Sequence, residues 1–358
     1  LAYHFLAAGE RDKALEYSYR AARRAEAVYA YQEALYHLQN VLRLLEDGEP
    51  AEIRREILER LGDVYALMGE RVHAIPIYQR SLEEWGHWDK VDSMQFVRLH
   101  RKIIQTFAGL KDYADVQHFS AARQSSIDAG LQLIQNTMHP EAALLLTALA
   151  REGRFAESTP NWQAIEHYAQ TAINMAEKLD SSTILASALG ALMDIYRERG
   201  LWRERVTVAH RRLSLVDDPR FDNLRERANI LNETGEALLR VGEAAQALPF
   251  LLEAEKIGER IRSIHPQFYA LQLQGECFFE LDRWDEMLQI EAKWQALQQR
   301  YSHQQVGRIC FYCGVSSSVH SLRGEVEEAK VKRDEAVTMM TQMSGKPVDD
   351  WTAAPYYY

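Results

Sequence analysis

Small and apolar side chains recur along this chain at intervals of three and four residues, the spacing of one face of an α-helix. Two such faces flank Gly69: Leu58, Leu61, Gly62 and Tyr65 come before it, and Ala74, Ile77, Tyr78 and Ser81 come after it. The polar-apolar alternation of half-buried β-strands is nearly absent. The pattern predicts two helices joined by a turn at Gly69, since glycine readily adopts the left-handed conformation that ends a helix.

The turn at Gly69 belongs to a phrase, Gly-Glu-x-x-x-Ala, that also begins at Gly9, Gly242 and Gly324. The residue five positions after the glycine, called the anchor below, sets a register at Ala34, Ala74, Val116, Ala164, Arg205, Ala247, Met287 and Ala329. Neighbouring anchors are 40 to 42 residues apart, apart from one step of 48. Removing residues 158–163 restores 42, so we expect a loop insertion there.

Each period therefore predicts one helix pair, and about eight pairs with a period of about 42 residues cover the chain. We predict an all-α protein of the α-solenoid type, in which each pair packs on its sequence neighbours. The anchor should be small because two helix backbones approach closely there. Val116, Arg205 and Met287 depart from this rule.

These units resemble the tetratricopeptide (TPR) repeat family. The matching positions are the small residues Gly62, Gly235 and Gly275, the aromatics Tyr65, Tyr196 and Phe278, and the turn glycines Gly69, Gly200, Gly242 and Gly324. The usual TPR period is 34 residues, and the longer units here are similar to those of MalT-type bacterial signal-transducing ATPases and of peptide-sensing regulators. The resemblance implies a right-handed superhelix whose first helices line a concave groove.

A second resemblance covers residues 4–42, "HFLAAGERDKALEYSYRAARRAEAVYAYQEALYHLQNVL". This stretch is similar to the segment that joins an ATPase and winged-helix region to a TPR superhelix in large bacterial regulators. The resemblance implies an ATPase domain upstream in the parent chain. No Walker A motif occurs in the sequence, so any such domain would lie outside these residues. Residues 1–48 are expected to hold the joining helices, 49–343 the TPR-like superhelix, and 344–358 a non-helical tail.

Composition restricts the class of partner. With 358 residues, 47% of them hydrophobic, the chain can bury a large core. Its formal net charge of −10 makes nucleic acid an improbable partner, because phosphate contacts need a basic surface. No apolar run approaches the roughly 20 residues that span a bilayer, there is no secretory leader, and only three cysteines occur. We therefore expect a cytoplasmic protein of a reducing compartment.

The best candidate for chemistry is a cluster of zinc-type ligands, His303, Cys310, Cys313 and His320. Four ligands strung along five helical turns cannot converge on one ion, so core packing is the favoured interpretation, with redox pairing of the cysteines as an alternative. Phosphate-binding loops, nucleophile elbows and H-E-x-x-H motifs are missing from the sequence. We expect no metal, no cofactor and no enzymatic activity.

The expected inner groove is the remaining candidate for a binding site. Its candidate ligand-binding residues are Glu59, Asp63, Arg101, Gln105, Asp194, Asn232, Glu236, Tyr269, Gln272 and Glu276. One row within it, Asp63, Gln105, Thr147, Asp194, Glu236, Glu276 and Ser318, is acidic at four of seven positions. If these side chains are exposed, they should attract a basic peptide or protein segment. The alternative is that they are ordinary solvated helix positions.

The Lys/Asn clamp with which chaperone-binding TPR domains hold a carboxylate is not matched, since Glu59 and Asp63 occupy its positions. The sequence thus favours a protein- or peptide-binding module, acting as the sensor or partner-docking region of a bacterial signalling ATPase or transcription regulator. A free-standing TPR adaptor or peptide receptor is the first alternative. An α-helical enzyme with its active site in the groove is a remote one.

Overall fold

The computed structural model describes residues 1–28, 30–45, 51–85, 93–110, 112–135, 137–153, 160–217, 221, 223–301 and 315–344. Its contacts divide the chain into two compact units, Leu1–Ile195 and Tyr196–Tyr358. Throughout the described residues, regular structure is helical, as predicted. None of these helices is both long and apolar enough to cross a membrane.

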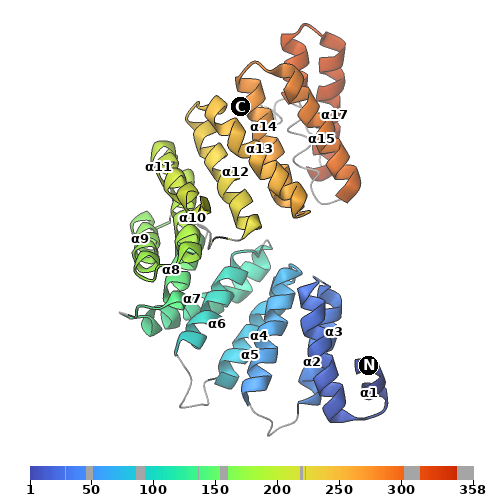
Figure 1. Ribbon diagram of the computed structural model, residues 1–358, viewed down its shortest axis with the longest axis vertical. Helices are drawn as coiled ribbons and strands as arrows, with labels where there is room; N and C mark the ends of the chain where they lie inside the picture. Colours follow the sequence, from blue (N-terminus) through green and yellow to red (C-terminus); the bar gives the residue numbers. More distant parts are fainter. Residues whose placement is uncertain are drawn as a thin grey trace. The chain divides into compact units, whose positions relative to one another are not determined.

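The helices of the first unit follow one another in sequence (Figure 1). They are α1 (Ala2–Ala7), α2 (Arg11–Ala27), α3 (Tyr31–Leu44), α4 (Ala51–Leu67), α5 (Arg71–Trp85), α6 (Ser93–Phe107), α7 (Tyr113–Leu133), α8 (Pro140–Glu152), α9 (Trp162–Lys178) and α10 (Ser182–Glu198), whose last turn crosses the unit boundary. Helices α2 and α3, α4 and α5, α6 and α7, and α8 and α9 pack as antiparallel pairs.

The second unit repeats this arrangement. Its helices are α11 (Trp202–Leu213), a short 3-10 helix (Ser214–Asp217), α12 (Leu224–Arg240), α13 (Ala244–Arg260), α14 (Ile264–Glu280), α15 (Trp284–Tyr301), a helix over 315–322 and α17 (Val326–Ser344). Helices α12 and α13 form one pair, and α14 and α15 form the next. The first helix of a pair also contacts the first helix of the following pair, as α12 does with α14 and α6 does with α8. The predicted solenoid order of helix pairs is confirmed.

The predicted turn glycines do end helices in the left-handed conformation. Gly69 has φ of 82°, its N–H donates to the carbonyl oxygen of Ala66 at 3.1 Å, and the N–H of Glu70 donates to that of Tyr65 at 2.9 Å. Gly9, Gly200, Gly242 and Gly324 have the same conformation. Three further turns place Asp180, Arg262 and Asp282 at positive φ. The same turn conformation therefore also occurs at positions without glycine.

The close approach inside each pair explains why small residues recur. Ala74 and Ala247 are fully buried. On the facing helix, a Cβ added to Gly62 would lie 2.5 Å from the ring of Tyr78, and one added to Gly235 would lie 2.5 Å from Leu251. In these two pairs, the second helix therefore places a large side chain directly on the backbone of the first.

Two expected boundaries differ from the structure. Helix α9 begins at Trp162, inside the loop expected over 158–163, because the Asn161 side chain caps the helix by accepting from the Ala164 N–H at 3.2 Å. Helix α17 runs to Ser344, one residue beyond the expected end of the repeats. Residues 158–159, the rest of the tail over 345–358, and His303, Cys310 and Cys313 lie outside the described residues.

We predict that Ala74→Arg lowers the stability of the protein by about 3 kcal/mol or more, because a long charged side chain would enter a fully buried contact between α4 and α5. Ala121→Arg is the matched control, since Ala121 is exposed on α7 of the same unit. Thermal melts followed by circular dichroism measure both. Equal melting temperatures for the two variants would contradict the assignment of Ala74 to the helix contact.

Candidate functional site

Ion pairs connect the first helices of neighbouring pairs in the first unit. Glu26 of α2 meets Arg60 of α4 at 2.7 Å, and Arg101 of α6 meets Glu141 of α8 at 3.0 Å. The pair between α8 and α10 is longer, with Arg151 and Asp194 3.7 Å apart. We call these contacts, with those of the Lys102 cluster below, the inter-repeat ion pairs. They put charge partners about one period apart in sequence.

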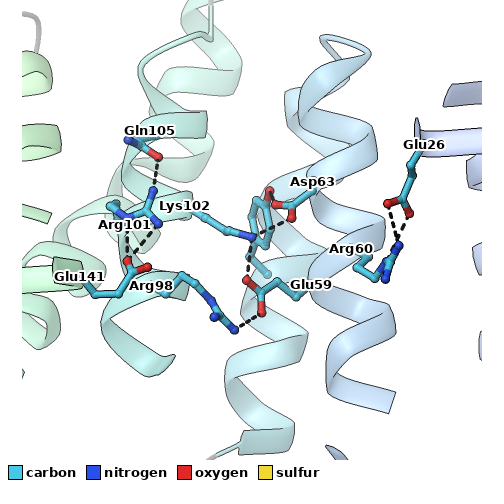
Figure 2. A network of polar contacts seen from close by, with 10 residues as sticks. Glu26, Glu59, Arg60, Asp63, Arg98, Arg101, Lys102, Gln105 and Glu141 are labelled. Carbon is cyan, nitrogen blue, oxygen red and sulfur yellow. Dashed lines mark hydrogen bonds and ion pairs between the residues drawn. The ribbon is translucent and has the colours of Figure 1, made fainter. Parts of the chain in front are cut away.

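The densest part of this series is the Lys102 cluster, formed by Glu59, Asp63, Tyr78, Arg98 and Lys102 (Figure 2). Lys102 Nζ lies 2.6 Å from Glu59 Oε1 and 2.7 Å from Asp63 Oδ2, so one ammonium joins two carboxylates of α4. Arg98 donates to the other oxygen of Glu59 at 2.7 Å, and the Tyr78 hydroxyl donates to Asp63 at 2.8 Å. Both carboxylates are therefore already engaged.

Burial and charge set the protonation of this cluster. Burial alone would raise the pKa of Glu59, but the charge of Lys102 and the hydrogen bonds from Lys102 and Arg98 outweigh it and hold that pKa below its ordinary value. Burial, followed by the charge of Asp63 and its hydrogen bond, raises the pKa of the Tyr78 hydroxyl. Glu59 thus stays ionised and Tyr78 stays protonated at neutral pH, which suits cohesion between helices and not proton transfer.

The structure brings four of the predicted site residues together in this region: Glu59, Asp63, Arg101 and Gln105. Arg101 contacts Glu141 and also donates to the side-chain oxygen of Gln105 at 3.0 Å. The expected row of free acids is not found here, because each carboxylate has a cation from the next first helix. Lys102 was not among the predicted site residues. It lies one turn before Thr106 on α6, so the helical register of the other site residues could have identified it.

In the second unit the predicted residues divide between core and surface. Glu236 was expected to be exposed, and this was wrong: it is buried, with an exposed fraction of 8%, and it accepts from Arg205 at 2.5 Å. The reason is that Arg205 occupies an anchor, is itself fully buried, and needs an anion. Asn232 is also fully buried, and its side-chain N–H donates to the carbonyl oxygen of Pro266 at 3.0 Å.

Tyr269 is partly buried beside this pair, and its hydroxyl donates to Glu236. Burial, then the charge of Glu236 and this hydrogen bond, raises the pKa of Tyr269. Nearer the surface, Gln272 donates to Glu276 at 3.3 Å, and Arg240 of α12 meets Glu276 of α14 at 2.7 Å. Glu236 and Glu276, like Glu59 and Asp63 of the first unit, are therefore paired with cations of neighbouring helices.

A pocket of about 400 Å³ opens between α4, α5 and α6. Its lining residues are Asp63, Ala66, Leu67, Arg71, Tyr78, Arg101, Lys102, Gln105 and Thr106. Three predicted site residues line it, together with Ala66, Leu67 and Tyr78. Its volume is within the range of ligand pockets, and most of its lining residues are polar or charged. Among the described residues, no group of three or more His, Cys, Asp or Glu side chains could hold a metal ion.

We predict that Glu59 makes the protein less stable in acid. A folded-state pKa held below the ordinary value of 4.5 means that the unfolded chain binds more protons in this range. Stability therefore rises with pH there and is lost as pH falls through the lowered pKa. Glu59→Gln should flatten the pH dependence of the urea midpoint between about pH 3 and 5. Glu52→Gln, on the exposed side of the same helix, should leave that slope unchanged.

A second prediction concerns the buried pair of the second unit. Glu236→Ala should destabilise the protein by about 3 to 5 kcal/mol, because it leaves the Arg205 charge buried without its partner. Adding Arg205→Ala should recover most of that loss, since alanine is the residue of five other anchors, Ala34, Ala74, Ala164, Ala247 and Ala329. Urea unfolding of both single variants and the double variant gives the coupling energy. Additive effects would show that the two side chains do not depend on each other.

No protein-family model and no curated protein matches this chain. Its structure is similar to that of a Signal Transduction ATPase with Numerous Domains (STAND) protein with a tetratricopeptide repeat sensor, PH0952 from Pyrococcus horikoshii, at 10% identity and a TM-score of 0.66. That likeness covers 93% of this chain and 48% of the Pyrococcus protein. The apo form of RapI is similar at 10% identity and a TM-score of 0.56, over 95% of this chain and 99% of RapI. By structure, the chain is a TPR-like α-helical repeat protein.

Proposed function

We propose that this chain is a peptide- or protein-binding module, and not an enzyme, that serves as the sensor or partner-docking region of a bacterial signalling ATPase or transcription regulator. The pocket between α4, α5 and α6 carries the proposal, because Ala66, Leu67 and Tyr78 line it together with arginine, lysine, amide and hydroxyl groups. The TPR-like fold supports it, since the similar Pyrococcus protein has a TPR region described as a sensor.

The likeness to the Pyrococcus protein also supports an upstream domain. This chain spans 48% of that signal-transducing ATPase, so a nucleotide-binding domain elsewhere in the parent chain fits the proposal. The alternative is a free-standing adaptor or peptide receptor. The likeness to RapI favours this alternative, because the matched region covers 99% of RapI and so leaves almost no further domain in that protein. The two roles share the same recognition pocket and differ in what the parent chain carries upstream.

The expected preference for basic partners loses its support. It depended on exposed acids, whereas Glu59, Asp63 and Glu236 are each paired with a lysine or arginine. In the pocket, recognition would use hydrogen bonds from Gln105 and Thr106 and contacts with Ala66 and Leu67.

The test is selection from a displayed library of random dodecapeptides against the immobilised full chain. We expect specific peptides to be enriched. Leu67→Trp should then weaken their binding by about tenfold or more, since a bulky ring would fill part of the pocket. The fold should survive, because Leu67 has an exposed fraction of 62%.

Leu322→Trp is the matched control, because Leu322 is a leucine of similar exposure, 59%, in the second unit. Its affinity for the selected peptides should equal that of the parent. Failure to enrich any peptide would remove the proposed function. Equal binding by the parent and Leu67→Trp would remove the pocket as its site.

A further inference from the structure

The pocket between α4, α5 and α6 holds an excess of positive charge. Its lining includes three cations, Arg71, Arg101 and Lys102, and a single carboxylate, Asp63. Asp63 already accepts from Lys102 and from the Tyr78 hydroxyl. Arg71 is therefore not neutralised by the acid that shares its pocket.

The charges around the pocket also leave Arg71 without a matching carboxylate. Arg98, Arg101 and Lys102 are matched by Glu59, Asp63 and Glu141, so these six charges cancel within the inter-repeat ion pairs (Figure 2). Arg71 lies outside that balance. Among the described residues, none forms a hydrogen bond or an ion pair with it. One guanidinium is left to face the pocket.

The position of Arg71 is not explained by the stability of its own helix. Arg71 is the first residue of α5, where the helix dipole disfavours a cation. Arg11 occupies the equivalent place after the turn at Gly9, and there the guanidinium is used: its Nε donates to the carbonyl oxygen of Leu44, the last residue of α3, at 3.1 Å. Arg71 makes no such bond to the end of α6.

The Arg71 side chain nevertheless has a defined place, in contact with Gly109. A Cβ on Gly109 would lie 1.8 Å from Arg71 Nε, so the side chain rests directly on the glycine backbone just after α6. Gly109 has no positive φ that would itself require glycine. The missing side chain at Gly109 therefore leaves room for the Arg71 side chain where it lines the pocket.

We propose that this pocket binds a carboxylate of the partner peptide, with Arg71 as the recognising cation and Gln105 and Thr106 as flanking hydrogen-bonding groups. An arginine can bind a carboxylate through two parallel hydrogen bonds. The partner segment is acidic at the pocket, through an Asp or Glu side chain or through its C-terminus. This proposal rests on the proposed function and reverses the sign of charge first expected for the ligand.

The experiment repeats the dodecapeptide selection with the full chain and with Arg71→Gln. The parent should enrich peptides rich in Asp and Glu or dependent on their C-terminal carboxylate. Arg71→Gln should bind the winning peptides about tenfold more weakly or worse. The affinity of the parent should fall as salt rises, and that of the variant should fall less.

Arg80→Gln is the matched control, since Arg80 lies on the same helix but outside the pocket, near Glu84. It should bind like the parent. Gly109→Ala gives an independent variant that leaves Arg71 in the sequence but displaces it, and it should also weaken binding. Thermal melts close to that of the parent would show that both pocket variants fold.

Synthetic copies of the winning peptide separate the two sources of carboxylate. An amidated C-terminus should abolish the Arg71 dependence if the terminus is bound, and Asp→Asn or Glu→Gln changes should do so if a side chain is bound. Enrichment of neutral or basic peptides whose binding is unchanged by Arg71→Gln would overturn the inference and leave the proposed function intact. No enrichment of any peptide would defeat the proposed function itself.

Discussion

Two helix pairs of this protein, α4–α5 and α12–α13, depend on the same close contact, in which the second helix places a large side chain on the bare backbone of the first. Tyr78 lies on Gly62 in this way, and Leu251 lies on Gly235. Such packing leaves no room for a longer side chain at the contact. It also fixes how each helix is rotated, and the rotation decides which side chains turn outward. The site follows from this constraint, since Tyr78 packs on Gly62 with its ring and binds Asp63 with its hydroxyl.

The side chains that point outward from these helices are paired with each other within the chain. Lys102 holds Glu59 and Asp63, and Arg101 holds Glu141. Partly buried pairs of this kind resist salt better than exposed ones, so they stiffen the contact between neighbouring repeats. A consequence for recognition is that the charges most visible in the sequence are the least available. Whatever discriminates between ligands must come from groups outside these pairs.

The fold could be predicted from the sequence because a period of about 42 residues and five repeated turn glycines are visible in short stretches of chain. The sequence also located Asp63, Arg101 and Gln105, which line one pocket. It could not show that the acids are paired, because each partner lies on another repeat and depends on helix rotation. Arg71 was missed for a different reason: it follows a turn, where periodicity gives no face. The departure of Arg205 from the small-anchor rule was the visible sign of the buried Glu236.

That anchor has a consequence for how the repeats can be arranged. Arg205 and Glu236 are 31 residues apart, and the same interval joins Ala74 to Gln105 and Val116 to Thr147. At this interval Arg205 meets a carboxylate, whereas Ala74 and Val116 have an amide and a hydroxyl residue at the same sequence distance. Exchanging or deleting a repeat at the junction of Arg205 and Glu236 would set a buried arginine against an amide or a hydroxyl. The order of the repeats is therefore part of what the sequence specifies, although their backbones are alike.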